Sequence, residues 1–212
     1  MADKDDIEYF FLKEDDFEEV AAFLKEDFFQ REPTTLGTSA NDKCEPSKGR
    51  MGEDLRRCLK SGLSVAARDR KTGKMVGARV SVFADRAKPH TPTQPPNELE
   101  ELYRVLDFVM GQAFNEKADK FLLMFLLSVH KDYGSRGIAG KMVKMCMEAG
   151  YAQGAEIACT CITNVLSGKV FLKLGYETRY TLDYEKPNHG YKVDLSKMYG
   201  NKTVRLMVKA LP

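Results

Sequence analysis

The chain has 212 residues, of which 43% are hydrophobic and 30% charged, as in an ordinary water-soluble globular protein. Lys and Arg number 33 and Asp and Glu 31, and the formal net charge of +2 argues against a nucleic-acid binder that relies on bulk positive charge. The charges are unevenly distributed along the chain. Residues 1–32 hold 12 acids and 4 bases, a net of −8, while the other 180 residues carry a net of +10.

The N-terminal sequence MADKDDIEYF lacks the basic region and the apolar core of a signal peptide. The longest apolar run, at 121–127, is too short to span a membrane. The five cysteines are an odd number, which favours reduced thiols and a cytoplasmic protein. Cys159 and Cys161 share one face of a predicted strand, but their spacing and the three scattered histidines fit no metal site, so no metal is expected.

The first half of the chain alternates between extended and helical patterns. Apolar residues recur at helical spacing after a short aromatic strand, and acids in the first turn suit the helix dipole. Lys71-Thr72-Gly73 joins two later strands as a hairpin turn. The predicted elements are a strand at 7–13, a helix at 14–30, a loop at 31–46, a helix at 47–60, strands at 63–70 and 74–85, and a proline-rich loop at 87–96.

The second half begins with Asn97-Glu98-Leu99-Glu100, which resembles a capping box that opens a helix ending near Lys117. The continuous apolar run FLLMFLLSV at 121–129 is typical of a strand covered on both faces. Further elements are a helix from 138, a strand at 155–162, a helix at 165–174, and strands at 176–184 and 202–210. This order predicts one α/β domain over residues 1–212, with a mixed central sheet of about seven strands flanked by helices.

A glycine-rich turn between a predicted buried strand and a helix is the most informative segment. It reads SVHKDYGSRGIAGKM at 128–142. Main-chain N–H groups at such a turn, together with the dipole of the following helix, form an anion site that glycines leave open to a phosphate. The P-loop pattern fails here, since Ser135 stands at its first glycine and Met142 at its metal-binding hydroxyl. The glycine spacing also does not fit the dinucleotide fingerprint G-x-G-x-x-G.

The segment GSRGIA at 134–139 is similar to the Q/R-x-x-G-x-G/A pyrophosphate loop of the GCN5-related N-acetyltransferase (GNAT) superfamily, with Gly at its first position. About 30 residues later, N-x-x-S-x-x-x-F-x-x-x-G-Y at 164–176 resembles the second signature of that superfamily, N-x-x-A-x-x-x-Y-x-x-x-G-F. The two signatures stand in the order and spacing of that fold. The resemblance covers most of the chain and implies a GNAT-like domain.

A third feature narrows the resemblance. Residues 28–33, FFQREP, resemble the Glu-Pro motif of the insect arylalkylamine N-acetyltransferases, and the segments at 128–129, 137–140 and 166–170 fit the same family, as does the C-terminal strand ending in Leu-Met-Val-Lys. Insect agmatine and polyamine acetyltransferases share this pattern. The resemblance implies an acyltransferase that moves an acetyl group from acetyl-CoA to the primary amine of a small arylalkylamine of the dopamine, serotonin, tyramine and octopamine class.

The resemblance implies acetyl-CoA as co-substrate, with its pyrophosphate on the main chain of the turn. The pantetheine arm would pair with the end of the preceding strand and bond to Asn164. The implied cofactor-binding residues are Leu127, Ser128, Val129, Gly134, Ser135, Arg136, Gly137, Ile138, Ala139, Gly140, Lys141 and Asn164. Neither nucleic acid nor a membrane is an expected partner.

The resemblance also assigns catalytic roles. A primary amine is protonated at pH 7 and must lose a proton before it attacks a thioester. That proton would go to Glu32, directly or through water, and Pro33 restricts Glu32 to an extended backbone. Thr163 and Ser167 resemble a pair of hydroxyl positions in the family, and Ser167 is expected to contact the thiol or relay a proton to it. Phe171 replaces the tyrosine that many members use as the acid, so the general acid is not identified.

Phe28, Phe29 and Pro33 are predicted to line the amine pocket. No cysteine lies in a nucleophile motif, which favours direct transfer within a ternary complex. The acidic residues 1–32 would face a cationic amine, and the basic remainder an anionic cofactor.

Three alternatives stay open. An agmatine or polyamine acetyltransferase would need a second acid at the far end of its amine pocket, which the sequence does not locate. The second is an acyl-CoA-binding module that has lost catalysis, which the departures at Gly134 and Phe171 support. Protein N-terminal acetylation is the weakest of the three, since it needs a peptide groove that the sequence does not reveal.

Overall fold

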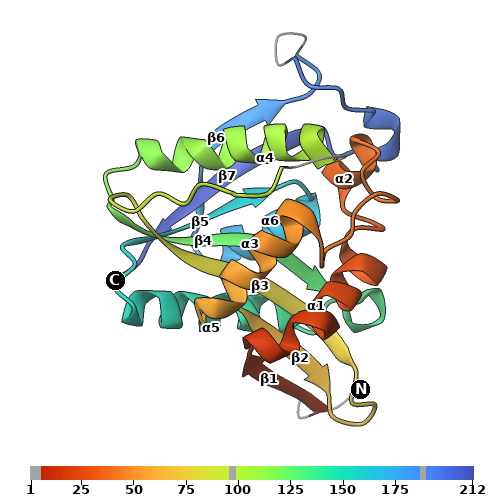
Figure 1. The fold of residues 1–212 in the computed structure, drawn as a ribbon, viewed down its shortest axis with the longest axis vertical. Helices are drawn as coiled ribbons and strands as arrows, with labels where there is room; N and C mark the ends of the chain where they lie inside the picture. The colour runs from red at the N-terminus through yellow and green to blue at the C-terminus, as the bar shows by residue number, and fades with distance from the viewer. Residues whose placement is uncertain (1–5, 96–98, 187–189) are drawn as a thin grey trace.

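The computed structural model describes residues 6–95, 99–186 and 190–212, and its centre is a seven-stranded sheet (Figure 1). The strands lie in the order β1-β2-β3-β4-β5-β7-β6, and all neighbours are antiparallel except β4 and β5, which are parallel. Their bounds are β1 Ile7–Phe11, β2 Val65–Asp69, β3 Met75–Asp85, β4 Lys120–Val129, β5 Ile157–Ile162, β6 Glu177–Asp183 and β7 Thr203–Ala210. The predicted α/β fold with a mixed sheet of about seven strands is confirmed.

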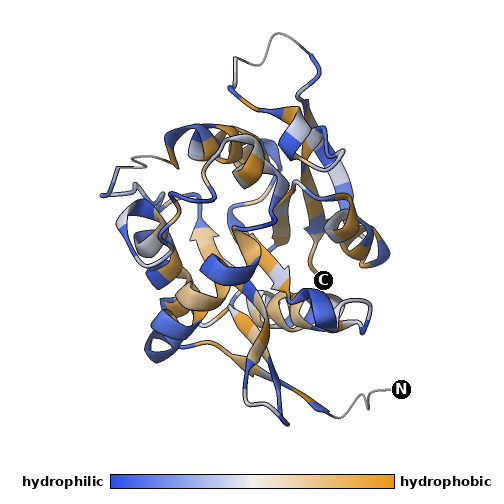
Figure 2. Ribbon diagram, turned by 90° about the vertical axis from the view of Figure 1, so that its right-hand side faces the viewer, coloured by the Kyte–Doolittle hydropathy of each residue, from blue (hydrophilic) through white to orange (hydrophobic). Residues whose placement is uncertain are grey.

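Helices cover both faces of the sheet. They are α1 Phe17–Phe23, α2 Pro33–Gly37, α3 Gly49–Lys60, α4 Glu100–Gly111, α5 Ile138–Ala152 and α6 Val165–Lys173. One hydrophobic core joins the sheet to α1, α3 and α4, and a second joins the opposite face to α5 and α6. Strand β4 contributes to both, with Leu123 in the first core and Leu122 and Met124 in the second, as its continuous apolar run predicts. Figure 2 shows the hydrophobic residues concentrated on the strands and on the helix faces that meet them.

The parallel strands β4 and β5 stay together over only part of their length. Residues 121–124 of β4 pair with 157–160 of β5, and beyond that point β4 continues to Val129 beside β3 alone. A bulge accompanies the separation, because Val80 lies opposite Leu126 while Ser81 lies opposite Met124. A bulge bends its strand and re-aims the side chains around it. The sheet therefore opens between β4 and β5 at the carboxyl ends of the two strands.

The segment from residue 14 to residue 46 differs from the sequence prediction. The single helix expected at 14–30 is α1 with a 3₁₀ turn before it and a π turn, Leu24–Phe28, after it. The loop expected at 31–46 contains the short helix α2, with Glu32 as N-cap and Pro33 at the first position, which proline favours. The N-cap position therefore fixes the backbone conformation of Glu32 where the chain turns into α2.

The helix expected to open at Asn97 is α4, which begins at Glu100 and ends at Gly111, with a 3₁₀ turn at Gln112–Asn115. The first two residues of the expected capping box lie outside the described residues. Short 3₁₀ turns at Lys131–Tyr133 and Leu195–Lys197 complete the fold. No helix in the described ranges has the length and apolar character needed to cross a membrane.

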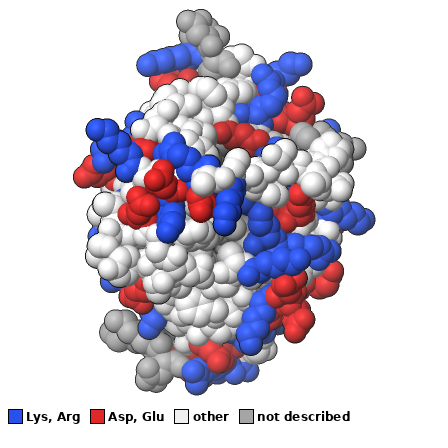
Figure 3. Space-filling model, turned by 60° about the vertical axis from the view of Figure 1, so that its left-hand side comes forward, with Lys and Arg blue, Asp and Glu red and all other residues white. Residues whose placement is uncertain are grey.

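The acidic N-terminal segment is partly neutralised by bases from elsewhere in the chain. The carboxylate of Glu19 accepts two hydrogen bonds from Arg68, at 2.7 and 2.8 Å, and Lys71 reaches Asp6 at 2.5 Å. Figure 3 shows acidic and basic side chains interleaved on one face of the molecule. At Glu19 and Asp6, acids of residues 1–32 are therefore paired with bases from the rest of the chain.

Candidate active site

A cleft of about 1400 Å³ lies where β4 and β5 separate. Its walls come from α2, α3 and α4 on one side and from the start of α5 and α6 on the other. A single small-molecule site usually has about 300–1000 Å³, so the cleft has room for two molecules. The sequence-predicted residues that line it are Phe28, Phe29, Glu32, Pro33, Leu127, Ser128, Val129, Gly134, Ser135, Ala139, Thr163, Asn164 and Ser167. The sequence-predicted residues that do not line the cleft are Arg136, Gly137, Ile138, Gly140 and Lys141.

The glycine-rich turn leads into α5 without a side-chain cap. Gly137 is the N-cap, with φ of +81°, and Ser135 has φ of +61°, so the backbone reverses sharply ahead of the helix. The first N–H groups of a helix and its dipole attract anions. Ile138 packs its side chain into the core, and Arg136 stacks on Tyr133 at 4.7 Å, so an anion here would meet main-chain groups first.

The exposed edge of β4 forms the next part of the wall. The N–H of His130 bonds to the carbonyl of Val76 in the neighbouring segment, at 2.8 Å. Because successive residues of a strand alternate, the main-chain groups of Leu127 and Val129 point away from β3. Strand β5 has already separated at this level, so this edge can accept an extended ligand as an added strand.

Helix α6 borders the cleft on the far side of the opening. Asn164 is its N-cap, since its Oδ1 accepts the N–H of Leu166 at 2.8 Å. The hydroxyl of Ser167 donates to the carbonyl of Asn164 at 2.9 Å, which leaves its lone pairs open to a ligand. Thr163 lies just before the helix. Phe171 is fully buried against Tyr176, with ring centroids 5.0 Å apart, and offers no proton.

Glu32 lies on the opposite wall with 8% of its surface exposed. Its carboxylate accepts the N–H of Thr34 at 3.0 Å, and both the N–H and the hydroxyl of Thr35 at 2.6 Å. A carboxylate has about four lone-pair positions, so one remains for a donor in the cleft. The capping bonds hold the carboxylate in one orientation and make it part of the α2 structure.

A polar network attaches the π turn to the end of β4. Ser128 Oγ donates to the buried carboxylate of Asp27 at 2.5 Å, and Arg31 pairs with the same carboxylate at 2.6 Å. Arg31 also donates to the carbonyl of Val129 at 2.5 Å. π turns are frequent at functional sites. Here the turn places Glu32 directly after the segment fastened to β4.

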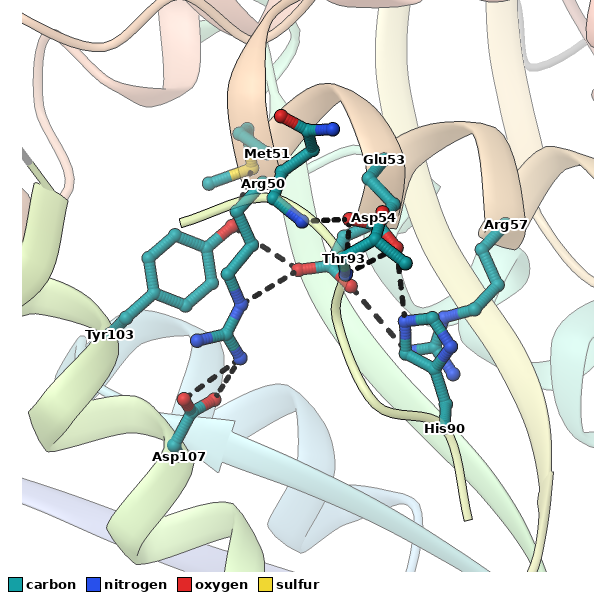
Figure 4. A network of polar contacts seen from close by, with 10 residues as sticks. Arg50, Met51, Glu53, Asp54, Arg57, His90, Thr93, Tyr103 and Asp107 are labelled. Carbon is teal, nitrogen blue, oxygen red and sulfur yellow. Dashed lines mark hydrogen bonds and ion pairs between the residues drawn. The ribbon is translucent and has the colours of Figure 1, made fainter. Parts of the chain in front are cut away.

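A second network of charged side chains lines the cleft between α3, α4 and the loop at 87–95 (Figure 4). Arg50 donates to Asp107 at 2.9 Å and stacks on Tyr103 at 4.0 Å, and the Tyr103 hydroxyl donates to Asp54 at 3.2 Å. Arg57 lies 3.6 Å from Asp54. Burial raises the pKa of both Asp54 and Asp107 above the ordinary value of 3.8, and the nearby guanidinium groups oppose that effect.

Cysteine 161 also lines the cleft, but burial raises the pKa of its thiol. Burial also raises the pKa of the other thiols, to about 12 for Cys44, Cys58 and Cys159 and to about 11 for Cys146. A thiol of this kind is a poor nucleophile near neutral pH. Among the described residues, no group of three His, Cys, Asp or Glu side chains is arranged to hold a metal.

Sequence reasoning missed the Asp27 network, the α3–α4 charge network and Arg79. Arg79 lies on β3, lines the cleft and is 1% exposed. A signal for it exists in the sequence, since it is the one charged residue inside the run MVGARVSVFA at 75–84. The Asp27 and α3–α4 networks join residues that stand on surface-type helical positions, and no local pattern marks them.

The sequence matches no model of a protein family and no curated protein. Solved structures do match over nearly the whole chain. A Drosophila melanogaster polyamine N-acetyltransferase that forms N-acetylagmatine has a TM-score of 0.76 at 18% identity, covering 97% of this chain and all of that one. The Aedes aegypti arylalkylamine N-acetyltransferase 2 has a TM-score of 0.78 at 18% identity, covering 98% of this chain and all of that one.

An agmatine N-acetyltransferase in its apo form gives a TM-score of 0.76, also at 18% identity, covering 98% of this chain and all of that one. The chain has the GNAT fold. These matches confirm the fold implied by the two sequence signatures. Because arylalkylamine and agmatine acetyltransferases match with TM-scores of 0.76 to 0.78 and the same 18% identity, the GNAT fold alone does not select between their amines.

Proposed function

We propose that the chain is an N-acetyltransferase that transfers the acetyl group of acetyl-CoA to the primary amine of a small arylalkylamine. One observation carries the proposal: a single cleft joins an uncapped helix start and a strand edge without a neighbouring strand on one side to a buried carboxylate on the other. The first side suits an anionic, extended thioester, and the second suits a cationic amine. The similar solved structures, which are N-acetyltransferases, support this assignment.

On the cofactor side, the main chain of residues 134–140 would bind the pyrophosphate, and the edge at 127–129 would pair with the pantetheine arm. Asn164 caps α6 with its own Oδ1, so its amide nitrogen is the group left to bond the arm. Arg31 competes for the carbonyl of Val129 and would have to release it if the arm pairs there.

On the amine side, Glu32 would attract the ammonium group and take its proton, with Phe28, Phe29 and Pro33 packing against the rest of the amine. The neutral nitrogen attacks the thioester carbonyl, and the C–S bond then breaks. Ser167 and Thr163 would contact the departing sulfur from the start of α6. The raised thiol pKa of Cys161 supports direct transfer over a covalent cysteine intermediate.

An agmatine or polyamine acetyltransferase is the second candidate, and the α3–α4 network bears on it. Asp54 and Asp107 supply carboxylates in the cleft, as a dicationic acceptor would require. Both already pair with Arg50, and Arg57 adds a second positive charge beside Asp54. This neutralisation, together with the many apolar side chains that line the cleft, favours an amine with an uncharged aromatic end.

The test is CoA release from acetyl-CoA with a panel of dopamine, serotonin, tyramine, octopamine, agmatine and spermidine, with acetylated products identified by mass. We expect kcat/KM for the arylalkylamines to exceed that for agmatine and spermidine by at least tenfold. Preference for agmatine would select the second candidate. Binding of CoA with no turnover of any amine would identify a binding module that has lost catalysis.

A further inference from the structure

Arg79 is a buried cation without a carboxylate partner. It projects from the middle of β3, and within the described ranges no Asp or Glu oxygen lies within ion-pair distance of it. Its Nε has no hydrogen-bond partner, and its Nη2 makes one bond, to Thr160 Oγ1 at 3.2 Å. Burial of an unpaired charge is costly, so the position calls for an explanation in function.

The guanidinium lies where β4 and β5 separate. Arg79 is paired in register with Leu127 of β4, and its side chain reaches Thr160, the last residue of β5 that pairs with β4. Thr160 fixes this placement, because its hydroxyl donates to the carbonyl of Met124 at 3.0 Å and turns a lone pair toward Arg79. The guanidinium is therefore held at the point where β4 and β5 separate, which we call the apex of the opening.

The surroundings of the guanidinium belong to the α5–α6 side of the sheet. Its strand neighbour Val65 lies in the α5 core, and its central carbon lies 5.4 Å from the centroid of the Phe171 ring on α6. The glycine-rich turn at 134–140, which would bind the pyrophosphate, lies on the same side of the sheet. A thioester whose arm runs from that turn along the edge of β4 brings its sulfur toward the apex.

The polar protons near the apex are committed to other groups. Phe171 has none, the Thr160 hydroxyl donates to the carbonyl of Met124, and the Tyr176 hydroxyl donates to the sulfur of Met124 at 3.4 Å. Burial lowers the pKa of Arg79 to about 10, which leaves the guanidinium charged at neutral pH. A group of this kind stabilises an anion through its charge and its N–H groups and keeps its own proton.

We propose that Arg79 binds the CoA sulfur as a thiolate, so that the leaving group departs as an anion paired with the guanidinium. This inference rests on the proposed function. In the step, the amine nitrogen bonds to the thioester carbon, the C–S bond breaks, and its electron pair stays on sulfur. The ammonium loses two protons: the first goes to Glu32 before attack, and Glu32 passes it to solvent and then takes the second as the amide forms. Arg79 gains and loses none.

The test compares the binding of CoA with that of desulfo-CoA, which lacks the thiol, by calorimetry from pH 6.5 to pH 9. In the wild-type chain we expect CoA to gain affinity over desulfo-CoA as pH rises, by about tenfold or more, the range of a hydrogen bond between charged groups. In R79M this pH-dependent gain should disappear, while desulfo-CoA binds as before. R68M, which removes a surface arginine paired with Glu19, is the matched control and should behave as wild type.

A thermal melt of the same variants separates this role from a structural one. Because R79M removes an unpaired buried charge, its Tm should equal or exceed that of the wild type. If R79M does not fold, R79K replaces it in the titration, and its shorter compact ammonium should reduce the pH-dependent gain at least threefold.

The outcomes are distinct. A wild-type chain that binds both ligands and acetylates amines, with an affinity ratio independent of pH or unchanged in R79M, contradicts the role of Arg79 alone. A wild-type chain that binds neither ligand contradicts the proposed function and this inference with it.

Discussion

The two sides of the cleft are built from different chemical groups. On the α5–α6 side the polar groups that face the cleft include main-chain ones, namely an uncapped helix start and a strand edge without a neighbouring strand, besides the side chains of Asn164 and Ser167. On the α2–α3–α4 side they are paired side chains, with Glu32 capping α2 and Arg50 paired to both Asp54 and Asp107. Main-chain groups depend on backbone shape and tolerate side-chain change. Paired side chains depend on the identity of each residue, so under the proposed function one substitution should alter the amine side more than the cofactor side.

The E32A substitution should have the largest effect and tests this contrast between the two sides most directly. Loss of the carboxylate should lower kcat/KM for amines by about 10² to 10⁴, the range for removing a positioned acid or base, and should change its pH dependence. The dissociation constant for CoA should stay within twofold of wild type. Steady-state kinetics across pH and a CoA titration measure the two effects.

E32A also removes a helix cap, which costs about 0.5–2 kcal/mol of stability. T35V is the matched control, because it removes a hydroxyl bond to Glu32 and leaves the carboxylate in place. Equal losses of kcat/KM for amines in E32A and T35V would show that Glu32 acts only as the N-cap of α2.

The next effect concerns the backbone of the cofactor side. G137A places a Cβ on a residue with φ of +81°, a strain of about 1–2 kcal/mol. We expect the turn to change shape and the CoA dissociation constant to rise about tenfold. G73A imposes a similar strain at φ of +69° in the β2–β3 hairpin, away from the cleft, and should leave CoA binding intact. Equal CoA affinity in the two variants would break the link between turn shape and cofactor binding.

The smallest effect is a pH dependence of stability on the amine side. Burial raises the pKa of Asp54 above 3.8, so the folded state binds more protons than the unfolded state as pH rises through that value. Asp54 therefore costs stability progressively above pH 3.8, up to its folded pKa. In D54N this cost is absent, and the free energy of unfolding of D54N relative to wild type should rise over that window by at most about 1.4 kcal/mol per pH unit. Denaturant melts at several pH values test it, and a difference independent of pH would contradict it.

The sequence predicted the parts of this molecule that follow from local pattern. The two signatures, with the continuous apolar run of β4 before the first, identified the GNAT fold and the strand-to-helix turn. The short helix α2 was missed, although Glu32-Pro33 is a suitable cap and first residue, because the surrounding segment lacks an apolar period. The roles of Glu32, Ser167 and the turn remain predictions.

The rest depends on contacts between distant residues. Ser128 meets Asp27 across 101 positions, and Arg79 meets Thr160 across 81. Such pairs form where strands separate or where a π turn shifts the residues that follow it. Neither feature produces a periodic pattern of apolar residues in the sequence. The charge asymmetry of residues 1–32 likewise does not reveal the pairs that Glu19 and Asp6 form with bases elsewhere in the chain.

The burial of the cysteines has a practical consequence for measuring the proposed reaction. A chromogenic reagent that reacts with thiolates will detect CoA as it is released, and it will react only slowly with the thiols of the chain itself. Four of the five are buried and the fifth is half-buried, and the pKa of each is raised. Turnover can therefore be followed continuously with little background from the protein, and a rise in that background would report that the chain is unfolding.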